Sequence, residues 1–485
     1  MRRTSLLVAG CCLLLGCAGL DPHAADPAAQ RRLRDDAIGD CARLFAASDR
    51  LIDAEGARDA QSPRVPGFPH LRVDRILARL ATAAAVPGDE PSSSWYRALA
   101  ELDASDRAIE LANTVGAPTA SVEALAACRQ TLGLADRNEL AKLQVVAQVP
   151  DDYSTMLRAL GLYPLTRYLF AAGIERWQQE TLATFAEHVI DTASSRRRVR
   201  YVPEPSPESL PLVRDLAELG LPSITGSAIA ALVARHAPRL EIDTAGDEDR
   251  PGALVWQSDR KGGERLAVAT AAPVLYVRSG HAQMAGRWLL QLSYTAWFSE
   301  RPPERAHDLL AGRFDGLLWR VTLAEDGSPL IYDTIHPCGC YHLFIPGDRV
   351  RARERQPGID EGMFAPQTLP TPAANERVVL RLAAGTHYLQ RVAVEAAAAP
   401  PGVRLALRDE DGLRSLPFPG GGRRSAFAAD GLLGGSERLE RFYFWPMGIR
   451  SAGQMRQWGR HATAFVGRRH FDDPTLLDRY FERLQ

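Results

Sequence analysis

The sequence has little excess charge and lacks the short motifs that mark several common enzyme classes. Its 485 residues carry 58 basic and 59 acidic side chains, which gives a formal net charge of −1. A chain without a basic field is not expected to bind nucleic acid. Neither Gly-x-Ser-x-Gly nor His-Glu-x-x-His occurs, so nothing supports a serine hydrolase with a nucleophile elbow or a zinc protease. The sequence also contains no internal repeat.

Long apolar runs are scarce too, and the clearest one lies at the N-terminus. Arg2 and Arg3 precede the apolar run at residues 5–16 (SLLVAGCCLLLG), which is too short to cross a bilayer. A short basic region followed by such a run is typical of a cleaved secretion signal. The sequence therefore predicts export from the cytoplasm.

The end of this run resembles the processing site of bacterial lipoproteins. LLGC at residues 14–17 has the leucine, small residues and cysteine of that site. The resemblance implies residues 1–17 as a signal peptide, Cys17 as the lipidated residue and residues 18–26 as a tether. Ala18, in place of aspartate, favours the outer membrane and a periplasm-facing body held to the membrane by the lipid on Cys17. An ordinary signal peptide with a chance cysteine is the alternative.

Few cysteines follow Cys17, and an oxidising compartment favours pairing among them. Four cysteines allow three pairings. Position along the chain favours a Cys41–Cys128 disulfide, because both residues lie in segments with helical periodicity. Cys338 and Cys340 would then form a second pair or serve as ligands. Two buried free thiols at Cys41 and Cys128 are the alternative.

The remaining chain of about 460 residues is long enough for two or three domains. Apolar residues recur at helical spacing over 27–200, after an Asp26-Pro27 start signal. Residues 201–252 are expected to be a proline-rich and turn-rich linker with one or two helices. Residues 253–485 change to a period of two and predict a β-rich domain with a C-terminal helix. The expected fold class is α+β, with a helical part followed by a mainly antiparallel β domain.

The β half contains one predicted antiparallel hairpin. LLWRVTL at residues 317–323 alternates apolar and polar side chains, EDGS at residues 325–328 is typical of a turn, and PLIYDTI at residues 329–335 returns. RVVLRL, YLQRVAVEA, RLALR and RFYFW are predicted as further strands. The C-terminal helix is predicted from DPTLLDRYFERL.

Candidate chemistry gathers directly after this hairpin, in IHPCGCYH at residues 335–342. His336, Cys338, Cys340 and His342 occupy every second position. On a straight strand the two histidines would be roughly 20 Å apart, so four ligands for one ion require the chain to fold back. Pro337 and Gly339 permit such a bend.

Three interpretations of this motif stay open. A transition metal such as zinc, iron or copper could bind His336, Cys338, Cys340 and His342. Cys338 and Cys340 could instead be a strained, exchangeable redox pair, although the thioredoxin-type Cys-x-x-Cys spacing is absent. A plain disulfide or two buried thiols would need no function.

Further candidates flank the motif or lie near the C-terminus. Asp333 could orient a ligand histidine or act as a base. The aromatic and basic stretch at residues 442–474 is typical of a pocket lining, or of a core strand followed by a solvated loop. Its side chains supply possible extra metal ligands and possible anion-binding groups: His461, His470, Arg456, Arg460, Arg468 and Arg469.

The motifs YDTIHPCGCYH and GRHATAFVGRRHFDDP, with QLSYTAWFSERP and VPDDYSTMLRALGLYPLT, resemble a family of uncharacterised proteobacterial lipoproteins. The resemblance extends over most of the mature chain and implies no activity. The sequence alone therefore favours an envelope lipoprotein with a metal site in its β domain. The leading function is a metal-dependent enzyme acting on a periplasmic substrate. A periplasmic thiol–disulfide protein and a non-catalytic envelope component are the alternatives.

Overall fold

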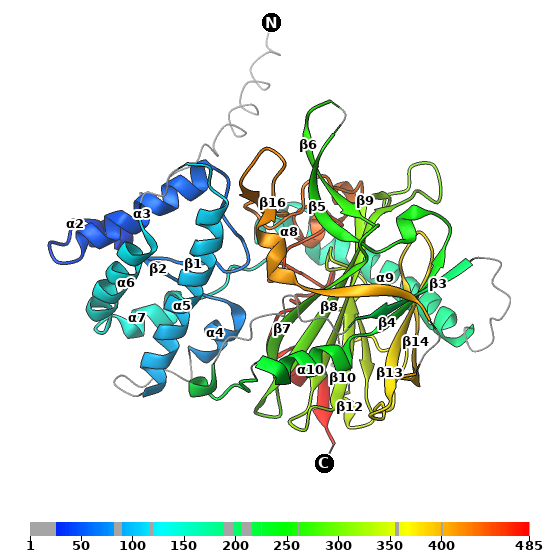
Figure 1. The fold of residues 1–485 in the computed structure, drawn as a ribbon. Coiled ribbons are helices and arrows are strands. Elements are labelled where there is room, and N and C mark those ends of the chain that lie inside the picture. The colour runs from blue at the N-terminus through cyan, green and yellow to red at the C-terminus, as the bar shows by residue number, and fades with distance from the viewer. Residues whose placement is uncertain are drawn as a thin grey trace, which may run out of the picture.

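The computed structural model describes residues 26–81, 90–116, 120–187, 197–204, 216–224, 226–259, 261–354, 358–398 and 401–484. Cys17, the expected signal peptide and residues 18–25 of the expected tether lie outside these residues. Asp26, the last residue of that predicted tether, belongs instead to the cap of the first helix. The fold is α+β, as predicted, with a helical N-terminal part beside a large, mostly antiparallel curled sheet. Figure 1 shows the helices α2 to α7 on one side of the molecule and the sheet on the other.

The helical part begins at the helix start predicted from Asp26 and Pro27. Asp26 caps the first helix by accepting a hydrogen bond from the Ala28 amide at 2.8 Å, and Pro27 occupies its first turn. A short hairpin of β1 and β2 separates the first two helices from the rest. The elements are α2 (Pro27–Arg34), α3 (Gly39–Ala54), β1 (Arg64–Val65), β2 (Phe68–Arg72), α4 (Arg75–Leu80), α5 (Glu90–Ala112), α6 (Val122–Asp136) and α7 (Leu140–Val146).

The predicted disulfide is present. Cys41 on α3 and Cys128 on α6 are joined, with their Cα atoms 5.0 Å apart. Phe45, Leu125 and Leu132 are buried around the bridge. The disulfide therefore fastens two helices that also share a small apolar core.

The β domain is organised on one ten-stranded sheet among the described residues. Its strand order is β11-β10-β9-β8-β7-β15-β3-β4-β13-β14. The β7–β15, β15–β3 and β4–β13 pairs are parallel and the other neighbours are antiparallel. The strands are β3 (Arg197–Pro203), β4 (Arg239–Thr244), β7 (Val274–Met284), β8 (Arg287–Arg301), β9 (Gly312–Leu323), β10 (Pro329–Ile335), β11 (Leu343–Pro346), β13 (Glu376–Leu382), β14 (Leu389–Ala396) and β15 (Val403–Asp409).

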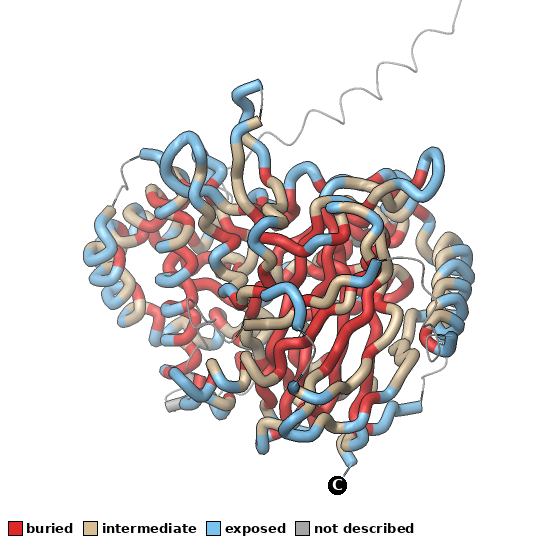
Figure 2. Tube along the Cα trace, turned by 45° about the vertical axis from the view of Figure 1, so that its right-hand side comes forward, coloured by how far each residue is buried: buried red, intermediate tan, exposed pale blue. Residues whose placement is uncertain are grey.

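The predicted hairpin is confirmed as β9 and β10, which pair in antiparallel register from Leu323 opposite Pro329 to Leu318 opposite Ile335. The long central strands are buried on both faces, as the red segments of Figure 2 show. Helices α9 (Tyr163–Glu187) and α10 (Gly226–His236) contribute side chains to the main core, such as Phe185 and Val233.

Two strands of this sheet come from a segment predicted as the end of the helical part and a linker. β3 and β4 pair in antiparallel fashion, and both lie in the interior of the strand order. Arg198 contacts Asp243 at 3.0 Å across the pair, and Arg200 contacts Glu241. These cross-strand ion pairs explain how a charged segment can occupy a sheet.

Several short elements complete the chain. They are α8 (Thr155–Leu160), η1 (Ala217–Leu219), η2 (Asp247–Asp249), β5 (Ala253–Ser258), β6 (Glu264–Ala269), β12 (Val350–Ala352), η3 (Glu410–Arg414), β16 (Leu416–Pro417), β17 (Arg423–Arg424), α11 (Arg441–Phe444), η4 (Trp445–Met447), α12 (Leu476–Tyr480) and β18 (Phe481–Arg483). The C-terminal helix is thus shorter than predicted, because its last residues form β18, which pairs with β12.

The strand prediction for RFYFW is wrong. Residues 441–444 form the helical turn α11, in which the Phe444 amide donates to the Glu440 carbonyl at 2.9 Å. Pro446 follows within η4 and has no amide to donate to a β ladder. The turn leaves Phe442 and Tyr443 exposed and brings Phe444 against Phe170 of α9, with ring centroids 5.3 Å apart.

Candidate functional site

The motif at residues 336–342 is the loop that joins β10 to β11. The loop closes on itself: the Gly339 amide donates to the His336 carbonyl at 2.8 Å, and the His336 amide donates to the Cys340 carbonyl at 3.0 Å. Gly339 has φ +92°, and a Cβ there would lie 2.4 Å from the Ala462 carbonyl oxygen. Glycine is therefore required for both the backbone conformation and the close approach of the neighbouring loop.

The two histidines of the motif turn toward different carboxylates. His336 contacts Asp315 at 3.2 Å through Nδ1, whereas His342 contacts Asp333 at 3.0 Å through Nε2. Both imidazoles are buried. Burial lowers the pKa of His342 to about 4 and also lowers the pKa of His336, against the opposing effect of Asp315.

Asp315 on β9 is the centre of a buried charged network. Besides His336, it contacts Nδ1 of His387 at 2.9 Å and the Arg438 guanidinium at 3.3 Å. Burial alone would raise its pKa, but His336 and Arg438 hold the pKa of Asp315 well below its usual range. His387 also lies 3.4 Å from Asp249. This network fixes the start of the loop to the sheet.

Asp333, predicted as a base or an orienting group, forms an ion pair inside the protein. Its two oxygens accept hydrogen bonds from Arg320 at 2.9 and 2.5 Å, and one of them also contacts His342. Burial would raise its pKa, but Arg320 and His342 lower it. The Arg320 guanidinium also lies over the Phe471 ring at 3.6 Å. Asp333 is therefore placed to orient His342 rather than to take up a proton.

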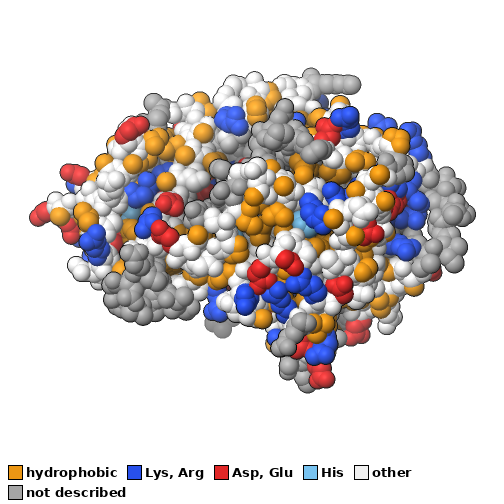
Figure 3. All heavy atoms as spheres, turned by 60° about the horizontal axis from the view of Figure 1, so that its bottom comes forward, with side chains coloured by type: hydrophobic (Ala, Val, Ile, Leu, Met, Phe, Trp, Pro, Cys, Tyr) orange, Lys and Arg blue, Asp and Glu red, His pale blue; other side chains and the backbone are white. Residues whose placement is uncertain are grey.

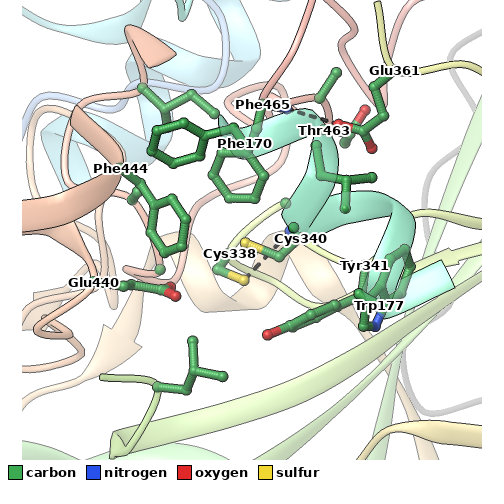
Figure 4. Close-up of a pocket in the computed structure, with 18 of the residues that line it drawn as sticks. Phe170, Trp177, Cys338, Cys340, Tyr341, Glu361, Glu440, Phe444, Thr463 and Phe465 are labelled. Atoms are coloured by element: carbon green, nitrogen blue, oxygen red, sulfur yellow. Dashed lines mark hydrogen bonds between the residues drawn. The ribbon is translucent and has the colours of Figure 1, made fainter. Parts of the chain in front are cut away.

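The thiols of Cys338 and Cys340 are free, and both line a cavity of about 580 Å³. The Cys340 amide donates to Cys338 Sγ at 3.4 Å. Hydrogen bonding to Cys338, together with burial, raises the pKa of Cys340 well above its usual value. Figure 4 shows the two sulfur atoms side by side in this cavity, beneath the phenyl rings of Phe170, Phe444 and Phe465.

A single carboxyl group with a strongly shifted pKa shares the cavity with the thiols. Glu440 is 4% exposed, and burial raises the pKa of its carboxyl to about 7. Its carboxylate packs against Gly453, where φ is +81° and any Cβ would collide with Oε1. Glu440 also acts on the Cys340 thiol, because its charge contributes to the raised pKa of Cys340. Figure 4 shows the carboxyl pointing toward the sulfur atoms.

An aromatic and cationic wall closes the other side of the cavity. The Tyr341 and Tyr388 rings pack at 4.7 Å, and Arg301 lies over the Tyr388 ring at 4.8 Å. Trp177 of α9 packs against Tyr341 at 5.5 Å. Burial raises the pKa of Tyr388 and raises the pKa of Tyr341 well above its usual value. Both tyrosines thus offer hydroxyl groups rather than negative charges.

The four arginines predicted to bind an anion have protein partners instead. Arg456 donates to the carbonyls of Cys338 and Ser451 at 3.3 and 3.1 Å, so it anchors the motif loop. Arg460 pairs with Asp152 at 2.8 Å, Arg468 with Asp151, and Arg469 with Glu361 at 2.9 Å. Arg456 and Arg469 therefore hold residues that line the cavity, namely Cys338 and Glu361. Arg460 and Arg468 pair with carboxylates outside the lining.

The histidines predicted as additional ligands also lie apart from the thiols. His461 is buried near Phe471, with ring centroids 6.4 Å apart, and His470 contacts Asp151 at 3.2 Å. Burial lowers the pKa of each to about 3. Within the described ranges, no group of three or more His, Cys, Asp or Glu side chains is placed to hold a metal ion. The four predicted ligands are not brought together here, because the histidines contact Asp315 and Asp333 while the thiols line the cavity.

Exposed apolar side chains are concentrated on the elements that pack beside the cavity. On α8, on α9 and between them, these are Met156, Leu160, Leu162, Leu165, Tyr168 and Leu169. On α11 and its flanks, they are Leu439, Phe442, Tyr443 and Trp445. Both α8 and α9 contact η4, and Leu169 and Phe444 line the cavity itself. We call these ten side chains the apolar rim.

Sequence reasoning missed several residues of the cavity. Trp177 comes from a helix more than 150 residues before the motif, and no spacing rule connects the two segments. Glu440 precedes the aromatic run FYFW, whose density did indicate a pocket, and Phe444, Ile449 and Phe465 of that stretch line the cavity. A lone glutamate carries no signal of burial in the sequence.

No protein-family model, curated protein or solved structure matches this chain. Among the described residues, no helix combines the length and apolar character needed to cross a membrane. The face in Figure 3 mixes basic and acidic side chains, in keeping with the near-zero net charge.

Proposed function

We propose that the chain is an envelope lipoprotein that carries out thiol–disulfide exchange through Cys338 and Cys340. The observation that carries the proposal is the presence of both free thiols on one cavity wall, beside a buried carboxyl group whose pKa lies near 7. Exported proteins meet disulfides as ordinary reactants. The lipid on Cys17 and the outer-membrane location belong to this proposal as well.

The loop geometry suits a pair that opens and closes. Gly339 lets the chain turn between the two cysteines, so that the Cys340 amide reaches Cys338 Sγ. A disulfide across a single intervening residue closes a small, strained ring, and strained disulfides are the exchangeable ones. A Cys338–Cys340 bond would therefore be a labile bond rather than a structural one.

The two cysteines have different exposure, which supports different roles for them. Cys338 is buried, whereas Cys340 is half-buried and faces the cavity. Cys340 is the attacking thiol: its sulfur bonds to one sulfur of a substrate disulfide, and the other substrate sulfur leaves as a thiolate. Cys338 then attacks Cys340, which closes the Cys338–Cys340 disulfide and releases the second substrate thiol. Two protein thiols are oxidised and one substrate disulfide is reduced.

Glu440 supplies the base that this step needs. A thiol with a raised pKa reacts slowly unless its proton is removed as it attacks. The carboxylate of Glu440 takes the proton of Cys340 and returns it to the leaving thiolate. With a pKa near 7, the carboxyl can both accept a proton and donate it again at neutral pH.

The test is exchange with a neutral small disulfide, hydroxyethyl disulfide, in the mature chain without its lipid. Oxidation of Cys338 and Cys340 should be followed by thiol alkylation and mass spectrometry. The proposal predicts stoichiometric release of two thiols per chain and no release from Cys340→Ser. Cys338→Ser should stop at a mixed disulfide. Equal thiol release from wild type and Cys340→Ser would exclude the proposal.

A further inference from the structure

We infer that the substrate of the Cys338–Cys340 site is an apolar, uncharged or basic polypeptide segment that carries a cysteine, rather than an anionic low-molecular-weight disulfide. The inference rests on the proposed exchange function. It specifies the substrate class from the charge of the cavity and from the apolar rim beside it.

Charge is the first argument. The ionisable side chains that line the cavity, apart from the thiols and tyrosines, are Glu180, Glu304, Glu361, Glu440 and Arg301. Glu361 pairs with Arg469, and Arg301 is the one cation among these lining residues. Glu180, Glu304 and Glu440 outnumber Arg301, so the lining has an acidic excess. An anionic tripeptide disulfide would bring like charges beside these carboxyl groups, two of which, Glu180 and Glu304, are exposed, and this is unfavourable.

The distribution of exposed apolar side chains is the second argument. Ten of the seventeen large apolar side chains that are exposed among the described residues belong to the rim, which occupies residues 156–169 and 439–445. Leu169 is 77% exposed and still lines the cavity. Exposed apolar side chains gathered beside a pocket, with one of them lining it, mark an interaction site.

Shape is the third argument. The cavity is apolar at the phenyl rings of Phe170, Phe444 and Phe465, and polar at the thiols and Glu440 (Figure 4). Its volume of about 580 Å³ suits one or two large side chains rather than a folded partner. A cysteine with an aromatic or aliphatic neighbour would place its sulfur at Cys340 and its neighbour among the phenyl rings. Residues farther along the segment would lie on the rim.

The test uses three disulfides with the mature chain: an apolar pentapeptide disulfide, the same peptide with its neighbours changed to aspartate, and oxidised glutathione. The inference predicts exchange with the apolar peptide about tenfold faster than with either anionic compound, because the apolar side chains are removed from water and the like charges are avoided. Equal or faster exchange with oxidised glutathione would overturn it.

Rim variants provide the matched comparison. Leu162→Ser/Leu165→Ser/Tyr443→Ser should raise the half-saturating concentration of the apolar peptide about tenfold and leave exchange with hydroxyethyl disulfide unchanged. Leu134→Ser/Val145→Ser changes equally exposed side chains outside the rim and should have no effect. If the rim variant keeps peptide affinity but loses binding to phosphatidylglycerol vesicles, or loses self-association in sedimentation, the rim serves a membrane or a second copy and the inference is wrong.

The outcomes separate the inference from the proposed function. If hydroxyethyl disulfide does not react, exchange is excluded, and calorimetric binding of the apolar peptide with serine in place of cysteine still decides the substrate class. Binding that depends on the rim would support the apolar-segment specificity, and no binding would contradict it.

Discussion

Glu440→Gln is the substitution with the most specific expected consequences. The change keeps the size and shape of the side chain against Gly453 and removes its ability to ionise. Because the carboxyl is buried, the protein should hold it in the neutral form more strongly than the unfolded chain does. Both the unfolding free energy and the exchange rate should therefore change with pH as the Glu440 carboxyl ionises.

The magnitude follows from the shift in pKa. The carboxyl titrates near 4.5 in an unfolded chain and near 7 in the fold. Below pH 4.5 the carboxyl is protonated in both the folded and the unfolded state, so it adds no pH dependence to the unfolding free energy. Between pH 4.5 and 7 the unfolded chain ionises first, so the folded state loses up to about 3 kcal/mol as the pH rises. Glu440→Gln should abolish this loss.

Urea denaturation at pH 5 and pH 8 would measure the effect. The unfolding free energy of Glu440→Gln relative to wild type should be higher at pH 8 than at pH 5 by about 2 to 3 kcal/mol. Exchange with hydroxyethyl disulfide should rise through pH 7 in wild type. In the variant it should lack this inflection and be slower by at least about a hundredfold. The role of Glu440 as the base would be refuted if wild type and Glu440→Gln lost stability in parallel between pH 5 and pH 8. It would also be refuted if the exchange rate of the variant kept the inflection near pH 7.

Three other changes test the structure around the site. Gly339→Ala should lower the unfolding free energy by about 2 kcal/mol or more and abolish exchange, because its Cβ collides with Ala462; fluorescence-detected denaturation and the thiol-release assay would show both. Asp315→Asn leaves His336, His387 and Arg438 around an uncharged group and should cost about 3 to 5 kcal/mol; no change in Tm would contradict the network. Cys41→Ser/Cys128→Ser opens a loop with a sequence separation of 87 and should cost up to about 4 to 5 kcal/mol without slowing exchange, which separates the structural disulfide from the reactive thiols.

Much of the fold could be predicted because it is encoded locally. The cap at Asp26, the helical spacing around Cys128 and the alternation in residues 317–335 each determine an element without distant contacts. β3 and β4 were missed although both alternate apolar and charged residues, as at Val199 and Tyr201 in β3. Both runs are short, each adjoins a proline-rich or turn-rich stretch, and their charges are paired only across the sheet. RFYFW was misassigned because aromatic residues favour strands by composition, whereas the neighbouring Pro446 and the packing on α9 favour a turn.

The site was predictable only in part. The bend at Pro337 and Gly339 was expected from residue type, and it places both cysteines on one wall. The directions of His336 and His342 depend on Asp315 and Asp333, which lie on separate strands, so their divergence could not be read from the motif. The cavity itself is assembled from α9, β8, the motif loop and residues 440–465, which no local pattern connects.

The most direct test of the exchange function is the reduction potential of the Cys338–Cys340 pair. The mature chain would be equilibrated in thiol–disulfide buffers, and the oxidised fraction would be measured by alkylation and mass spectrometry, with Cys41–Cys128 as the internal structural reference. A strained exchangeable pair should have a potential between about −270 and −120 mV. A potential below about −300 mV, or the absence of any Cys338–Cys340 bond under oxidising conditions, would contradict the exchange function.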